Sequence, residues 1–82
     1  MNADDLEQRV LSVFHTVAPD VDPVSLQRDV PFRDQFDFDS MDTLNFALGL
    51  HKIFSIDVPE RDYPRLASLG SAIAYIRDHR VE

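Results

Sequence analysis

The 82-residue sequence contains no cysteine, which excludes both a disulfide framework and thiolate ligands for a metal ion. No stretch approaches the roughly 18 apolar residues that a membrane-spanning helix requires. The opening residues, MNADDLEQRV, carry acids where a secretory signal has basic residues followed by an apolar run. From these absences we expect a soluble, cytoplasmic protein without a membrane span.

Basic residues are scarce as well. Eight Lys and Arg oppose 15 Asp and Glu, which gives a net charge of −7 and a pI near 4.6. Five aspartates and one arginine fall between Asp29 and Asp42, so this window alone carries −4. Such a field repels nucleic acids and anionic membranes and attracts basic protein surfaces. We therefore expect protein partners with basic patches and no nucleic acid, although a solvated acidic loop would show the same charge.

A chain of this length buries about 60–65% of its unfolded surface, enough for one modest core but not for a deep, multi-walled active site. We expect a single domain over residues 1–82 and a monomer. Apolar residues do not alternate with period 2 over any useful length, and no repeat is present. The fold class that this indicates is all-α.

Three main helices are expected. The first carries one apolar stripe and ends at APDVDP, where Pro19 and Pro23 prevent continuation. The stripe consists of Leu6, Val10, Val13, Phe14 and Val17. A long connection from about Asp20 to Phe38 follows, and its apolar residues indicate that it folds over the core. They are Leu26, Val30, Phe32, Phe36 and Phe38.

The second helix is expected from about Ser40 to Phe54, with Asp39 as N-cap and Asp42 completing an acidic capping box. Gly49 in its interior costs roughly 1 kcal/mol relative to alanine, which indicates close packing. One apolar side holds Phe46, Ala47, Leu50, Ile53 and Phe54, and a second side holds Met41, Leu44 and Leu48. Only one side can face so small a core. The other is either a docking surface or covered by the long connection.

The segment SIDVPERDYPRL then predicts a short helical piece that Pro59 opens and Pro64 limits. The last helix is expected from about Ser68 to Arg80, with Leu66 leading in and an apolar seam of Leu69, Ala72, Ile73 and Ile76. The predicted fold is a small four-helix bundle with three main helices, one short third helix, and a long loop between helices 1 and 2.

Ser40 invites four interpretations. A hydrolytic serine requires an adjacent base, but there is no G-x-S-x-G motif and His51 would lie about 16 Å away along the same helix. A calcium loop counted from Asp37 fails, because Asp42 stands at the glycine position and Leu48 at the glutamate position. We therefore expect no catalytic residue and no metal site beyond loose, unspecific cation binding to the acidic window. Ser40 as a helix cap and Ser40 as a covalent attachment site both remain open, the latter because free N–H groups at a helix start favour a phosphate.

The sequence resembles the acyl carrier proteins, the phosphopantetheine-binding family, along essentially its whole length. The matching elements, in order, are PFRDQFDF, DSMDT, a helix ending in IF, the IDVPE turn and the terminal AIAYI helix. The resemblance implies a four-helix bundle in which a phosphopantetheinyl transferase attaches 4'-phosphopantetheine to Ser40, beside Asp39. The thiol of that arm would carry acyl groups as thioesters to partner enzymes of fatty acid, lipid or polyketide-type biosynthesis, so the protein itself would not be an enzyme.

The same resemblance makes the helix that begins at Ser40 the recognition helix. Its implied partner contacts are Met41, Asp42, Leu44 and Leu48, for acyl-transferring or synthase enzymes with basic docking patches. An acyl chain would tuck between helices against Phe46, Ala47, Leu50 and the final helix. An aminoacyl or peptidyl carrier, and an acidic interaction module that is never modified, remain as alternatives.

The chain also departs from the family pattern. Fatty-acid carriers typically have glutamates along the recognition helix where this sequence has Asn45, His51 and Lys52, which favours a specialised carrier with its own partner enzymes. Asp37 replaces a common glycine and is tolerated there if the backbone is left-handed. Phe38 adds bulk beside Ser40, and Pro64 is expected to shorten the third helix.

Overall fold

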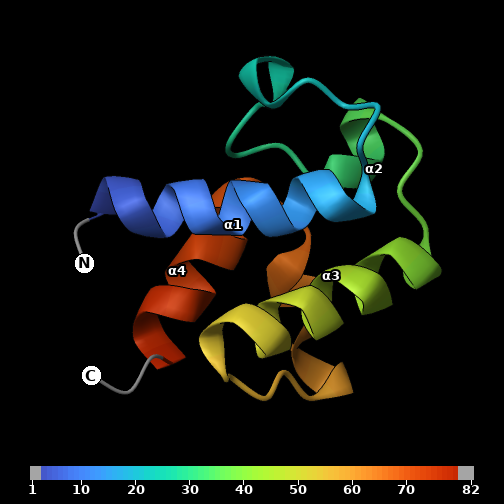
Figure 1. Ribbon diagram of the computed structural model, residues 1–82. Helices are drawn as coiled ribbons and strands as arrows, with labels where there is room; N and C mark the ends of the chain where they lie inside the picture. Colours follow the sequence, from blue (N-terminus) through green and yellow to red (C-terminus); the bar gives the residue numbers. More distant parts are fainter. Residues whose placement is uncertain (1–2, 80–82) are drawn as a thin grey trace.

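The computed structural model describes residues 3–79 and contains no β-strand within them (Figure 1). In chain order the elements are α1 (Ala3–Val17), η1 (Pro23–Ser25), α2 (Phe32–Gln35), α3 (Ser40–Phe54), η2 (Glu60–Leu66) and α4 (Leu69–His79). The all-α prediction is confirmed, with α1, α3 and α4 as the main helices and η2 as the short third one. Arg80, the expected end of the last helix, lies outside the described residues.

The core forms where α1 crosses α3 and α4 (Figure 1). The predicted stripe of α1 is buried as far as Phe14, and Val17 packs against its edge. The seam of α4 is buried as predicted, together with Leu66 ahead of it. From α3, Phe46, Ala47 and Leu50 are buried. Ile53 was expected on this side but is 51% exposed, because it lies ~60° around the helix from Leu50, at the edge of the buried face.

Gly49 brings α3 close to α1, as its position in the helix interior predicts. A Cβ atom at Gly49 would lie 2.6 Å from Cγ1 of Val13, far inside van der Waals contact. Val13 is itself buried and β-branched, so it has little freedom to move away. The glycine therefore sets how near the two helices approach.

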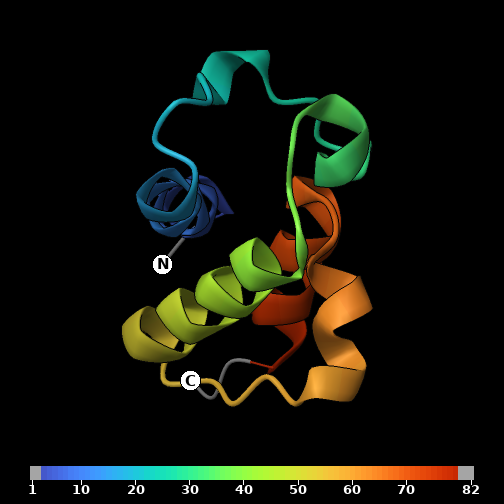
Figure 2. The ribbon, with the colours of Figure 1, turned by 90° about the vertical axis from the view of Figure 1, so that its right-hand side faces the viewer.

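The long connection folds over the core through its phenylalanines, as predicted. Phe32 is fully buried and stacks on Phe14 of α1 with ring centroids 4.5 Å apart. Phe38 lies 5.1 Å from Phe32, and Phe36 lies 5.7 Å from Phe14. Phe46 of α3 meets the ring of Phe14 at 5.8 Å. The connection, whose backbone arches from the end of α1 to the start of α3 in Figure 2, thus contributes side chains to the hydrophobic core.

The sequence pattern predicts a plain loop for this connection, but the structure shows more regular structure there. It contains the helical turns η1 and α2, neither long enough to show a helical apolar stripe. The Gln35 side chain bonds the backbone of Gln27 in both directions, at 2.8 and 2.9 Å, and donates to the Val30 carbonyl at 2.8 Å. The backbone N–H of Phe32 donates to the Ala67 carbonyl at 2.7 Å, which ties α2 to the end of η2.

Pro64 does not shorten the third helix, contrary to expectation. It lies inside η2, which continues to the buried Leu66. A proline in a short 3₁₀ segment removes one N–H bond but still offers its carbonyl. The Ala67 N–H accordingly donates to the Pro64 carbonyl at 3.3 Å.

Tyr75 of α4 contacts two charged residues of η2 and so joins the two elements. Its ring is fully buried, its hydroxyl donates to Asp62 Oδ2 at 2.8 Å, and the Arg65 guanidinium lies 4.9 Å above the ring centroid. Burial, and then the hydrogen bond and negative charge of Asp62, raise the pKa of Tyr75 above its usual value of 10.0. The phenol therefore remains a neutral donor at physiological pH.

The close approach at Gly49 leads to a stability prediction. We expect Gly49→Ala to destabilise the fold by about 1 kcal/mol, because overpacking of about 1–3 kcal/mol outweighs a helix-propensity gain of about 1 kcal/mol. Urea unfolding followed by circular dichroism measures the change. Asn45→Ala, at an exposed position of the same helix, is the matched control and should not destabilise. A Gly49→Ala protein as stable as this control would contradict the steric argument, and adding Val13→Ala should relieve part of the loss.

Candidate functional site

Ser40 is the first residue of α3 and is exposed where the connection from Phe38 enters the helix. The helix cap is Asp39, as predicted. Its Oδ1 accepts from the Asp42 N–H at 3.0 Å, and Asp42 Oδ2 accepts from the Asp39 N–H at 3.1 Å. Because Asp39 performs this role, the interpretation of Ser40 as the cap is wrong. In the described part of the chain, the Ser40 hydroxyl makes no hydrogen bond.

The turn before Ser40 does not need a glycine. Asp37 does not have a left-handed backbone, since Ser55 is the positive-φ residue found between residues 3 and 79. Phe38 directs its ring toward Phe32 and is half-buried, so its bulk packs on the core. Aspartate and phenylalanine are thus both accommodated in an extended entry to α3.

A cavity of about 580 Å³ opens beside the Ser40 hydroxyl, between the start of α3 and η2. Its lining residues are Arg33, Phe38, Asp39, Ser40, Thr43, Tyr63, Pro64 and Ala67. This volume lies within the range of about 300–1,000 Å³ that is typical of small-molecule sites. A group attached to Ser40 therefore has room to lie against the protein as well as to extend into solvent.

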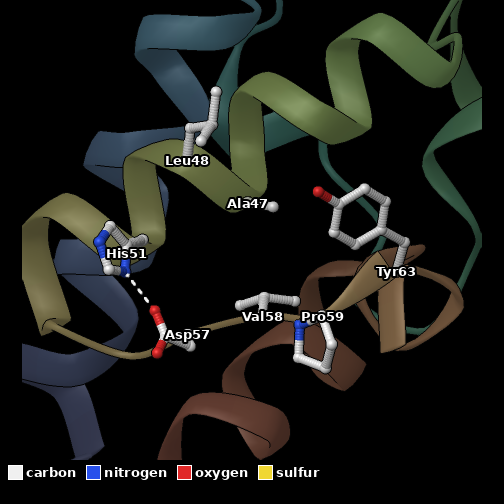
Figure 3. Close-up of a pocket in the computed structure, with 7 residues that line it drawn as sticks. All are labelled: Ala47, Leu48, His51, Asp57, Val58, Pro59 and Tyr63. Atoms are coloured by element: carbon white, nitrogen blue, oxygen red, sulfur yellow. Dashed lines mark ion pairs between the residues drawn. The ribbon is translucent and has the colours of Figure 1, made fainter. Parts of the chain in front are cut away.

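A second cavity, of about 430 Å³, also borders Tyr63 (Figure 3). Its lining residues are Ala47, Leu48, His51, Asp57, Val58, Pro59 and Tyr63. Tyr63 extends from η2 with its hydroxyl pointing toward α3, and it borders both cavities. Both hollows lie beside α3 and share Tyr63, and Ser40 lines the first of them; we call the two together the α3–η2 groove.

His51 lies at the far end of this groove, well away from Ser40. Its Nδ1 lies 3.2 Å from both the Ile56 carbonyl and Asp57 Oδ1 (Figure 3). Both contacts tie the end of α3 to the turn that follows it. His51 therefore has a structural role in the wall of the second cavity and does not act as a base at the serine.

The second apolar side of α3 is exposed, which means that the long connection does not cover it. Met41 is 60% exposed and Leu48 is 55% exposed, while Leu44 is half-buried beside them. Asn45 and Lys52 are exposed on the same face. Asp42 adjoins this face but is engaged in the capping box. The residues predicted to contact partners are thus presented together, starting next to Ser40.

The residues predicted to hold an acyl chain lie mainly in the core. Phe46 and Leu50 are fully buried and border neither cavity, whereas Ala47 borders the second one. The groove is lined instead by residues that the sequence pattern does not single out for this purpose, such as Tyr63, Val58 and Thr43. Thr43 belongs to α3, whereas Tyr63 of η2 and Val58 ahead of it reach this place because η2 packs against α3.

Between residues 3 and 79 there is no group of three His, Asp or Glu side chains arranged to hold a metal ion. In the same range, no helix combines the length and apolar character needed to cross a membrane.

The double capping at α3 can be tested by substitution. We expect Asp39→Ala to cost about 1 kcal/mol of stability, because the N–H groups of the first turn lose their acceptor. Asp39→Asn keeps an acceptor oxygen without the charge and should retain most of the stability. Thermal and urea unfolding of the two variants measure the difference. Equal losses in both variants would show that the negative charge, and not the hydrogen bond, holds the start of the helix.

No family model matches the chain. A protein of Schizosaccharomyces pombe named as a mitochondrial acyl carrier is 31% identical over 72 residues, which cover 88% of this chain and 64% of that protein. The acyl carrier protein of Lactobacillus acidophilus is 30% identical over 61 residues, 74% of this chain and 76% of that protein. The mitochondrial acyl carrier protein of Saccharomyces cerevisiae is 27% identical over 79 residues, 93% of this chain and 63% of that protein. The chain thus spans less than two thirds of the two mitochondrial relatives. It belongs to the acyl carrier protein family.

Proposed function

We propose that this protein carries acyl groups as thioesters on a 4'-phosphopantetheine arm attached to Ser40. It presents them to partner enzymes of fatty acid, lipid or polyketide-type biosynthesis and performs no catalysis itself. Residues 1–82 form a single carrier domain. The observation that carries this proposal is the exposed Ser40 hydroxyl at the start of α3, which makes no hydrogen bond in the described chain because Asp39 serves as the cap.

Attachment is a phosphoryl transfer to this hydroxyl. The Ser40 oxygen forms a bond to the phosphorus of the phosphopantetheine half of coenzyme A, the pyrophosphate bond breaks, and the nucleotide bisphosphate leaves. The serine proton passes to a base of the transferase, since His51 is engaged at the other end of α3. The exposed first turn gives the transferase access to the oxygen.

The bound arm would supply a thiol that can form a thioester. This chain contributes the attachment point and the α3–η2 groove, where the arm and a short cargo can lie between Tyr63 and α3. The groove is open to solvent on one side, so that cargo remains accessible to a partner. Its lining does not distinguish an acyl from an aminoacyl or peptidyl cargo, and we favour the acyl cargo on family grounds.

The attachment can be tested by mass. Incubation of the full chain with coenzyme A and a broad-range phosphopantetheinyl transferase should add the mass of one phosphopantetheine. Ser40→Ala should add none, and Ser12→Ala, which changes an exposed serine of α1, is the control that should still be modified. An unchanged wild-type mass would instead favour the unmodified interaction module.

The exposed face of α3 gives the proposed partner surface. Met41, Leu44 and Leu48 supply apolar contacts, while Asp42 and the acids before Ser40 attract basic docking patches on the transferase and on acyl-transferring enzymes. Further along the face the charge changes, because Asn45 and Lys52 are exposed there. A generalist partner enzyme with basic residues along its whole docking surface would not be attracted to the part of α3 that carries Asn45 and Lys52. We therefore propose a specialised set of partners. We also propose a cytoplasmic location.

The specialisation can be tested by adding acids at the two exposed positions. We expect Asn45→Glu/Lys52→Glu to raise charging of the phosphopantetheinylated protein by a housekeeping acyl-ACP synthetase, by roughly tenfold at low salt. His51 stays unchanged, because glutamate there would face Asp57. The matched control is Asn45→Gln/Lys52→Gln, which adds no acid. Equal rates in the wild type and both variants would remove the basis for a specialised partner set.

A further inference from the structure

We propose that Arg33 binds the phosphodiester of the arm on Ser40 and so directs the arm into the α3–η2 groove. The inference rests on the proposed function and assigns a position to the attached group. It is carried by the juxtaposition of Arg33 and Ser40 on the same cavity of about 580 Å³.

Arg33 is held in place by the core beneath it. It follows Phe32, which is fully buried and stacks on Phe14 at 4.5 Å. The Phe32 N–H donates to the Ala67 carbonyl at 2.7 Å, and the Phe36 N–H donates to the Phe32 carbonyl at 3.1 Å. The backbone of Arg33 is thus fixed on both sides, while its side chain is exposed. A short, anchored helical turn therefore carries Arg33 on the wall of the cavity that Ser40 also borders.

Arg33 is also a cation without a partner among residues 3–79. Arg28 pairs with Glu7 and Arg65 stacks on Tyr75, but Arg33 makes no ion pair, hydrogen bond or ring contact in the described structure. This holds although it borders a second hollow, of about 470 Å³, together with Asp37, Asp39 and Asp42. Its charge is thus available to a ligand at Ser40.

The positive charge of Arg33 would stabilise a phosphodiester attached to Ser40. A phosphodiester on Ser40 adds one negative charge beside Asp37, Asp39 and Asp42, and like charges at short range are unfavourable. Two of these carboxylates cannot move away, because Asp39 and Asp42 hold each other in the capping box at 3.0 and 3.1 Å. A cation on the opposite wall offsets the repulsion. Arginine suits this role because its planar fork can donate two hydrogen bonds to one phosphate.

The position of Arg33 also sets the direction of the arm. Of the two hollows that Arg33 borders, Ser40 lines the one that also contains Tyr63, Pro64 and Ala67. The other contains Asp37 and Asp42, and Asp39 lines both. Beyond the phosphate the arm is uncharged and begins with a gem-dimethyl group, which favours the side with fewer carboxylates and more apolar lining. A phosphate held by Arg33 therefore places the start of the arm at the entrance of the α3–η2 groove.

The test uses the full chain in its apo and phosphopantetheine-bearing forms, with intact mass confirming the conversion. We expect the Arg33 Nε–Hε resonance in ¹⁵N NMR spectra to shift between the two forms, and the shift to shrink as salt is raised. We also expect the ³¹P resonance of the diester in Arg33→Gln to differ from that of the wild type. Arg33→Lys, which keeps the charge but loses the fork, should give an intermediate ³¹P value.

Arg61→Gln is the matched control, because Arg61 is exposed on η2 and borders neither hollow that Arg33 borders. Its ³¹P resonance should equal that of the wild type.

Successful modification with identical Arg33 resonances in both forms, or with the same ³¹P resonance in the wild type and Arg33→Gln, would overturn this inference and leave the carrier function standing. Failure of the wild type to gain mass would overturn both. If Arg33→Gln does not fold, the comparison of wild-type forms decides the question alone.

Discussion

The stacking of Phe32 on Phe14 is the contact on which the rest of the structure depends. It joins the long connection to α1 at a ring separation of 4.5 Å and draws Phe36, Phe38 and Phe46 into one aromatic cluster. Because Phe38 is part of the cluster, the chain enters α3 from a fixed point two residues before Ser40. Because Phe32 is part of it, α2 is fixed beside that entry. The place where cargo would be attached is therefore determined by packing in the core.

Charge around this corner has two effects. Asp39 and Asp42 stabilise the start of α3 by hydrogen bonds to its free N–H groups and by their position on the helix dipole. They also make the surface next to Ser40 acidic, which favours association with basic partners. The same two residues thus stabilise the start of α3 and give its surface the negative charge that attracts basic proteins. The two carboxylates also repel any further anion near Ser40, and a nearby cation would offset this repulsion.

Much of this could be predicted from the sequence, because the relevant signals are local. The bounds of α3, the capping box and the close packing at Gly49 follow from residue types at fixed spacing along one helix. The continuation of η2 past Pro64 could not be predicted, since a 3₁₀ segment tolerates a proline. The exposure of Ile53 could not be predicted either, since the edge of a buried face depends on the neighbouring helix. Arg33, Tyr63 and the groove were also missed, because they come from segments far apart in the sequence that only the folded chain brings together. Backbone hydrogen bonds from Phe32 to Ala67 and from Gly70 to Arg28 join the connection to the end of η2 and the start of α4, and η2 packs against α3.

If Ser40 carries the proposed arm, the absence of cysteine has a chemical consequence. These 82 residues contain no sulfhydryl of their own, so the sulfur introduced by the arm would be chemically unique within them. A cargo bound there could not migrate to a neighbouring side-chain sulfur, and the arm could not be trapped by oxidation onto its own carrier. Loading and unloading would then depend only on the enzymes that visit the exposed corner of the bundle.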